Sequence, residues 1–341
     1  MDSLILDNAI RGTNEDAVTS KLSAVNAGYI QDSYVKYFVK KPSRRPPIIN
    51  RGTYVRYAGL DALIKKFLEA GIGNDNNDEG KKKVPKIKKQ IVSLGAGSDT
   101  RYFNFKSKKL LDSLYKYFEI DYPEVTAKKV VVIRKNKQLS EFFEGNVELG
   151  LGGAELYASD YCLLSGDLKE FVESIIPRME KQGFNKSLPT LFLSECVLIY
   201  MEPQDSDKII QWIGDNMQAA LFALYEQILP NDAFGAIMLQ NLRLRNIELR
   251  GIHAYPDLES QKNRFLSRQW TFAEAVDINQ IHDHHIDPQE MTRISRLEIL
   301  DELEEWRLLA AHYCIAWAYS VKDESMKELL EQVRSIDYQT K

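Results

Sequence analysis

Short apolar runs alternate with longer, more polar stretches of helical spacing from residue 91 onward. Each run has the length of a buried strand, and the stretches between the runs are long enough for crossover helices. This alternation is typical of parallel βαβ units, so it predicts an α/β fold built on a doubly wound sheet. The predicted strands cover residues 91–94, 117–120, 161–164, 190–193 and 221–224.

The two ends of the chain have other patterns. Residues 1–70 predict helical pieces around a basic, proline-containing loop at 40–47, with clear helical spacing over 57–70. Residues 71–89 are rich in Gly, Asn, Asp and Lys, which predicts an exposed connection. Near the other end, the spacing predicts a long helix over 288–310 and one more strand over 313–320, at a mixed edge of the sheet. Residues 1–90 are therefore expected to form a helical cap with its linker, and residues 91–341 the main domain.

Composition excludes several classes of protein. Lys and Arg number 45 against 49 Asp and Glu, so the net charge is −4 and nucleic acid is not expected as a partner. The three cysteines lie far apart, which favours a reduced, cytoplasmic location. Acidic residues interrupt the apolar N-terminus, and the most apolar late stretch falls short of the roughly 18–20 residues that cross a bilayer. We therefore expect neither a signal peptide nor a membrane partner.

A Gly-x-Gly turn follows the first predicted strand directly, with Gly95 and Gly97 in the sequence Leu-Gly-Ala-Gly-Ser-Asp-Thr. Glycine is needed where the chain turns sharply or where a ligand must touch the backbone. The third glycine of the dinucleotide fingerprint would fall at Thr100, which argues against NAD. An ordinary turn explains the two glycines equally well.

Acidic residues follow the next three predicted strands, at Asp121, Asp167 and Glu195. The carboxyl ends of parallel strands meet at one edge of the sheet, so these acids are expected to converge on one pocket. Asp121 can accept both hydroxyls of a ribose, Asp167 an adenine amine beside Leu168, and Glu195 an ammonium group. S-adenosylmethionine carries all three groups. Plainer roles stay open, because Asp121 can be a turn residue and Asp167 the N-cap of a helix.

Several sequence blocks together resemble the leucine carboxyl methyltransferases, S-adenosylmethionine enzymes of the class I methyltransferase fold. The resemblance covers nearly the whole chain. It implies methylation of the free α-carboxylate of the C-terminal leucine of the type 2A protein phosphatase catalytic subunit. The blocks are Arg-Gly-Thr at 11–13 with Asp16, Asn-Arg-Gly-Thr-Tyr-Val-Arg at 50–56, the glycine loop at 92–100, Phe-Glu-Ile-Asp-Tyr-Pro at 118–123, Glu-Cys-Val-Leu-Ile-Tyr-Met at 195–201 and Leu-Glu-Ser-Gln-Lys at 258–262.

The resemblance also implies roles for single residues. Tyr200 matches a position on the substrate side. From chain position alone, the N-terminal cap and the segment around 234–270 are expected to form the substrate entrance. Gln269 departs from the family, which commonly has Gly before the Trp at this point, so the local turn geometry is in question. The implied cofactor contacts are Lys21, Arg56, Gly95, Asp121, Asp167, Leu168 and Glu195.

The chemistry implied by the family needs few catalytic residues. A C-terminal carboxylate has a pKa of about 3.3–3.7, so it is already ionised at neutral pH and needs no general base. Arg56 suits a carboxylate because its fork binds bidentately, and it can hold the carboxylate of the cofactor, of the substrate, or of both. Tyr200 either hydrogen-bonds the substrate or packs under the sheet. No metal is expected, and the His-rich segment 281–285 predicts a polar loop.

Two other functions fit parts of this evidence. One is a related methyltransferase that modifies a hypermodified tRNA base, although such relatives carry a further C-terminal repeat domain and this sequence ends at Lys341. The other is a non-catalytic phosphatase-binding protein that keeps the cofactor fold for structure alone. The acids of the predicted cofactor site argue against the second.

Overall fold

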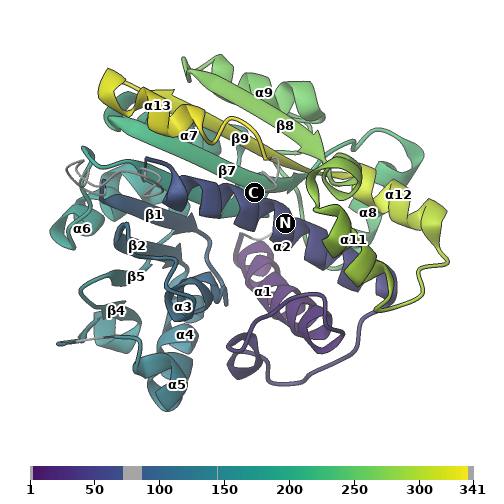
Figure 1. Cartoon of the computed structure of the whole chain (residues 1–341), viewed down its shortest axis with the longest axis horizontal. Coiled ribbons are helices and arrows are strands. Elements are labelled where there is room, and N and C mark those ends of the chain that lie inside the picture. Colours follow the sequence, from purple (N-terminus) through teal and green to yellow (C-terminus); the bar gives the residue numbers. More distant parts are fainter. Residues whose placement is uncertain (1–2, 72–86, 144, 337–341) are drawn as a thin grey trace, which may run out of the picture.

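A mixed β-sheet runs through the molecule, with helices on both of its faces (Figure 1). The computed structural model describes residues 3–71, 87–143 and 145–336. In this part of the chain the strands follow the order β3-β4-β5-β2-β1-β6-β7-β9-β8. Their bounds are β1 Lys89–Leu94, β2 Leu114–Asp121, β3 Glu148–Gly150, β4 Glu155–Tyr157, β5 Tyr161–Ser165, β6 Thr190–Glu195, β7 Ala219–Gln227, β8 Phe272–Asp277 and β9 Tyr313–Val321.

Five parallel strands form the centre of the sheet. They lie in the order β5-β2-β1-β6-β7, and the chain reverses its direction of winding after it leaves β5. The two edges are antiparallel, because β9 lies between β7 and β8 at one edge while β3 and β4 form a hairpin beside β5 at the other. This is the doubly wound α/β sheet that the sequence predicts.

Helices cover the two faces with separate apolar clusters. One cluster joins the sheet to α2, α3, α4, α12 and α13, and the other joins it to α6, α7 and α9. The helix bounds are α1 Ser3–Asn26, α2 Pro47–Glu69, α3 Arg101–Ser107, α4 Pro123–Lys135, α5 Lys137–Ser140, α6 Ile176–Lys181, α7 Pro203–Asn216, α8 Ala233–Leu244, α9 Leu258–Leu266, α10 Ile278–Gln280, α11 Pro288–Ser295, α12 Leu303–Ala311 and α13 Lys327–Glu331.

All six predicted strands are confirmed, and the helices around the proline-containing loop are present as α1 and α2. The prediction of one helix over 288–310 is wrong, because α11 ends at Ser295 and α12 begins at Leu303. Between them Glu298 accepts hydrogen bonds from Asn50 at 2.9 Å and Arg44 at 3.2 Å, which holds this segment against the start of α2. The His-rich segment is a π-helical turn, η6 (Ile281–His285), rather than a loop.

The predicted connection over 71–89 lies mostly outside the described residues, but its last residue is clearly part of the fold. Lys89 begins β1 and is buried. Its Nζ donates to the carbonyl oxygens of Phe67, Leu68 and Ala70, at 2.6, 2.8 and 2.5 Å. The last carbonyls of a helix have no partner within it, so Lys89 satisfies the end of α2 and fixes that helix to β1. No helix among the described residues is long and apolar enough to cross a membrane.

Candidate active site

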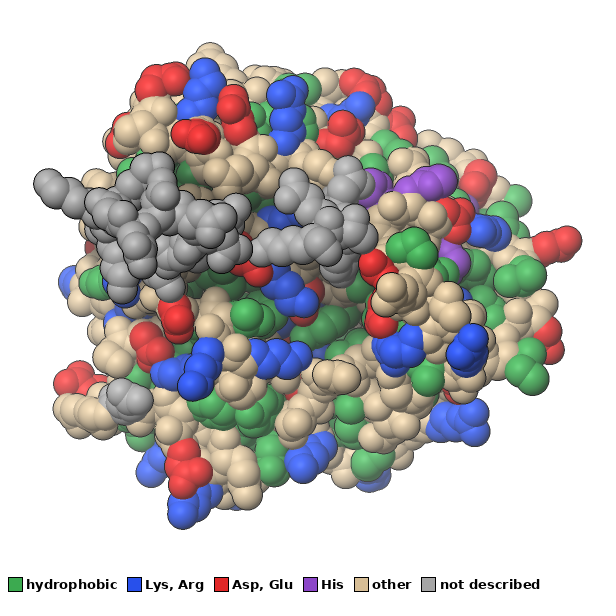
Figure 2. Space-filling model, in the orientation of Figure 1, with side chains coloured by type: hydrophobic (Ala, Val, Ile, Leu, Met, Phe, Trp, Pro, Cys, Tyr) green, Lys and Arg blue, Asp and Glu red, His purple; other side chains and the backbone are tan. Residues whose placement is uncertain are grey.

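A cavity of about 820 Å³ opens at the carboxyl ends of the parallel strands, under α1 and α2. In the space-filling view this face is hollowed near its centre, and Lys and Arg side chains lie in and around the hollow (Figure 2). All eight candidate residues from the sequence line this one cavity: Lys21, Arg56, Gly95, Asp121, Asp167, Leu168, Glu195 and Tyr200.

The glycine loop is shaped by close neighbours from other segments. Gly95 and Gly97 have φ values of +62° and +53°, in the left-handed region that side chains rarely adopt. A Cβ on Gly95 would lie 2.5 Å from the side chain of Val197, and one on Gly97 would lie 2.5 Å from Oδ1 of Asn14. Asn14 of α1 also accepts from the backbone N–H of Ser98 at 2.8 Å. The loop therefore needs glycine twice, and α1 lies directly against it.

Two strand-end acids border the cavity beside this loop. Asp121 ends β2, and its two oxygens accept from the backbone N–H groups of Gly97 and Tyr122, each at 2.7 Å. Asp167 follows β5 and accepts from the backbone N–H of Lys169 at 3.0 Å, as the N-cap of η3 (Leu168–Glu170). The plainer role for Asp167 is thus confirmed, and it coexists with a place in the cavity wall.

Glu195, at the end of β6, is held between two guanidinium groups. Its Oε1 lies 2.5 Å from Nε of Arg56, and its Oε2 lies 2.7 Å from Nη1 of Arg101. Burial alone would raise the pKa of Glu195, but the charges of Arg101 and Arg56 outweigh burial and lower it to about 2. Glu195 is therefore ionised throughout the neutral range. A carboxylate has about four acceptor positions, so this pairing leaves room for a further donor.

Arg101 joins this pair to the glycine loop, and the sequence analysis did not single it out. Its side chain is only 2% exposed, and it donates to Asp61 of α2 at 2.8 Å and to Asp99 at 3.1 Å. Lys21 lies 3.5 Å from Asp99 and donates to Thr100 at 2.8 Å. One sequence signal could have identified Arg101 and Asp99. An acidic and a basic residue stand directly after the glycines, where helix α3 begins.

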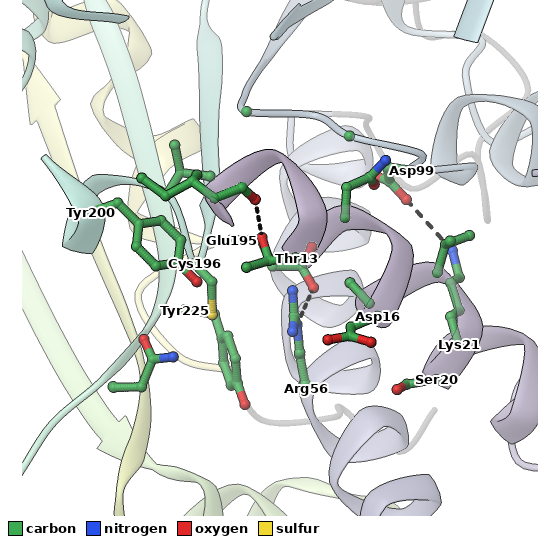
Figure 3. A pocket seen from close by; sticks show the side chains of 18 of the residues that line it. Thr13, Asp16, Ser20, Lys21, Arg56, Asp99, Glu195, Cys196, Tyr200 and Tyr225 are labelled. Atoms are coloured by element: carbon green, nitrogen blue, oxygen red, sulfur yellow. Dashed lines mark hydrogen bonds and ion pairs between the residues drawn. The ribbon is translucent and has the colours of Figure 1, made fainter. Parts of the chain in front are cut away.

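Aromatic side chains form the wall on the other side of Arg56 (Figure 3). Burial raises the pKa of the Tyr200, Tyr225 and Tyr313 hydroxyls above the ordinary value, so all three stay protonated and can donate. Burial likewise raises the pKa of the Cys196 thiol to about 12. Tyr313 belongs to the aromatic stretch 306–317, whose residues were expected either to line a leucine pocket or to pack in the core, and it lines the cavity. Tyr225 was not predicted as a site residue, although it directly follows a predicted strand, where a ligand crevice is expected.

Gln269 adopts a left-handed backbone conformation of the kind that favours glycine. It has a φ of +61°, and its backbone N–H donates to Leu266 at 3.1 Å, so the chain turns sharply after α9. The next residue, Trp270, is buried against Phe222 and Phe265. Gln269 does not line the cavity.

The chain is similar to known proteins over most of its length. The family model for leucine carboxyl methyltransferase matches residues 9–214. The chain is 40% identical over 314 residues to the leucine carboxyl methyltransferase 1 homolog of Arabidopsis thaliana, covering 91% of this chain and 89% of the relative. The chain belongs to the leucine carboxyl methyltransferase family.

Two further proteins share similarity with the chain. It is 36% identical over 309 residues to tRNA wybutosine-synthesizing protein 4 of Homo sapiens, covering 90% of this chain and 43% of that protein. A solved structure of a DUF574 family protein from Streptomyces avermitilis gives a TM-score of 0.49 at 13% identity, over 89% of this chain and 97% of that one.

Membership of the leucine carboxyl methyltransferases makes this chain an S-adenosylmethionine-dependent methyltransferase. The cavity suits that cofactor in three respects. The left-handed glycines leave backbone without Cβ atoms at its edge, two strand-end acids border it, and the ionised pair of Glu195 and Arg56 lies within it. Among the described residues no group of three or more His, Cys, Asp or Glu side chains could hold a metal ion.

We propose that Asp121 accepts two hydrogen bonds from the ribose hydroxyls of the cofactor. Replacing Asp121 with Ala should then weaken S-adenosylmethionine binding about 100-fold, because both would be lost. Isothermal titration calorimetry measures this directly. Asp112→Ala is the matched control, since Asp112 is exposed and lies just before the opposite end of the same strand. Equal affinities for the wild type and Asp121→Ala would contradict the assignment of Asp121 to the cofactor.

Proposed function

We propose that this methyltransferase esterifies the α-carboxylate of the C-terminal leucine of the type 2A protein phosphatase catalytic subunit. The observation that carries the proposal is the composition of the wall beyond Arg56. That wall presents the hydroxyls of Tyr200, Tyr225 and Tyr313 and the thiol of Cys196, all protonated. It can donate hydrogen bonds but offers no general base, which suits a nucleophile that is already an anion.

The charged half of the cavity suits the amino-acid end of the cofactor. An α-amino acid presents an ammonium group beside a carboxylate, and Glu195 beside Arg56 presents the opposite charges in the same arrangement. Arg56 contacts Glu195 through Nε, and its side chain is 26% exposed. Its terminal nitrogens can therefore bind a carboxylate as a fork while Nε remains on Glu195. Lys21 adds a second positive charge to the same cavity.

The protein then has to position two groups rather than move a proton. Bound S-adenosylmethionine supplies an electrophilic methyl group, and the substrate carboxylate is ionised because its pKa is about 3.3–3.7. Tyr200 and its aromatic neighbours hold the carboxylate and exclude water. Orientation of this kind can contribute up to about 7–11 kcal/mol to lowering a barrier.

Two lines of evidence support a protein substrate. The resemblance identified in the sequence is to the enzymes that methylate the phosphatase, and the Arabidopsis thaliana relative bears the family's name. The tRNA wybutosine-synthesizing protein is similar at 36% identity, so identity alone separates the two substrates poorly. The net charge of −4 favours the protein substrate, because tRNA binding draws on a positive field.

Transfer of labelled methyl from S-adenosylmethionine tests the proposal. The acceptors are purified type 2A phosphatase catalytic subunit, the same subunit without its terminal leucine, and tRNA. We expect base-labile label on the intact subunit alone, since a carboxyl ester hydrolyses readily in base. If no acceptor is labelled while the protein still binds the cofactor, the substrate assignment is wrong, and label on tRNA alone would identify the alternative.

Replacing Tyr200 with Phe should lower kcat/KM for the phosphatase about tenfold, because one hydrogen bond to a charged group is lost. The affinity for S-adenosylmethionine should change less than about twofold, since Tyr200 is assigned to the substrate. Tyr115→Phe is the control, because Tyr115 is exposed on β2 and does not line the cavity. A loss of cofactor affinity equal to the loss of kcat/KM would contradict this role.

A further inference from the structure

Two arginines from distant segments meet over one carboxylate at the outer part of the cavity. Arg45 precedes α2, Arg245 follows α8, and both contact Asp16 of α1 through Nη2. The Arg45 contact is 3.4 Å long, and all three residues line the cavity. The exposed fractions of the side chains are 32% for Arg45, 56% for Arg245 and 51% for Asp16. The side chain of Arg101, deeper in the site, is only 2% exposed. These three residues, Arg45, Arg245 and Asp16, the rim cluster, therefore lie at the solvent-exposed part of the cavity wall.

The rim cluster carries an excess of positive charge. One carboxylate faces two guanidinium groups, so one positive charge remains unbalanced. Each guanidinium has five N–H donors, and each contacts Asp16 through one nitrogen. Unused donors and surplus charge together indicate a place for a second carboxylate.

The helix that begins beside Arg45 gives the distance from the rim cluster to the reaction site. Arg45 lies just before α2, and Arg56 is nine positions after the first helical residue, Pro47, which corresponds to about 14 Å at the helical rise of about 1.5 Å per residue. An extended peptide covers about 3.3–3.6 Å per residue, so this distance equals about four residues. Side-chain reach widens the estimate to between three and five residues.

We propose that Arg45 and Arg245 bind an acidic side chain of the substrate, three to five residues before its C-terminal leucine. The incoming carboxylate joins Asp16 and makes the rim cluster electrically neutral. This proposal rests on the proposed function, since it places the terminal carboxylate near Arg56. It adds a second point of recognition, which fixes the direction of the tail and selects acidic tails over neutral ones.

The test compares phosphatase catalytic subunits that carry either Asp or Asn at the third, fourth or fifth position before the terminal leucine. At low salt the wild-type enzyme should prefer Asp at one of these positions about fivefold in kcat/KM. The preference should fall below about twofold in the double variant Arg45→Gln/Arg245→Gln, and in the wild type at high salt. Because each enzyme is compared with itself on two substrates, a partly unfolded variant lowers both rates alike.

The chain offers a matched control in Arg44→Gln/Arg243→Gln. Arg44 is 83% exposed, Arg243 is also exposed, and neither lines the cavity, yet the change in net charge is the same. This control should keep the full preference for Asp. Equal rates on the Asp and Asn subunits at all three positions would overturn the rim site. If both kinds of subunit are still methylated only when the terminal leucine is present, the proposed function stands. Absence of transfer to every subunit would overturn both.

Discussion

The carboxylate of Glu195 between Arg56 and Arg101 is the interaction on which the site depends. It joins the end of β6 to α2 and to the start of α3. Through Arg101 it also reaches Asp61 and Asp99, so the glycine loop belongs to the same network. Burying a charge costs free energy unless the charge has a partner of opposite sign. In this network each acid is paired with an arginine. Any one substitution would leave an uncompensated charge beside the cofactor site.

This network divides the cavity into halves of different chemistry. The half beside the glycine loop holds fixed charges, whereas the half beyond Arg56 holds phenols and a thiol whose pKa values are raised by burial. Charged groups suit an amino-acid end with an ammonium and a carboxylate. Protonated donors suit an anion that must remain nucleophilic, because a full counter-charge would hold its electrons more firmly. The division therefore suits the cofactor and is consistent with the proposed transfer of a methyl group to a carboxylate.

The sequence predicts the charged half of the cavity well, because the spacing of apolar residues predicts the strands and the site residues lie just after them. Gly95, Asp121, Asp167 and Glu195 each follow a predicted parallel strand, and such strands end at one edge. The sequence does not predict contacts between residues that are distant in the chain. Lys89 looks like part of a polar linker but caps α2, and the meeting of Arg45 with Arg245 joins segments 200 positions apart. Strands β3, β4 and β8 were missed, because they lie at the antiparallel edges of the sheet, outside the βαβ alternation.

The most direct test of this account is whether Glu195 recognises the ammonium group of the cofactor. Calorimetry would compare S-adenosylhomocysteine with its analogue lacking the amino group, in the wild type and in Glu195→Gln. The wild type should bind the amino compound about tenfold more tightly, because a charged hydrogen bond is involved, and the variant should lose most of this difference. The same tenfold difference in both proteins would contradict the account.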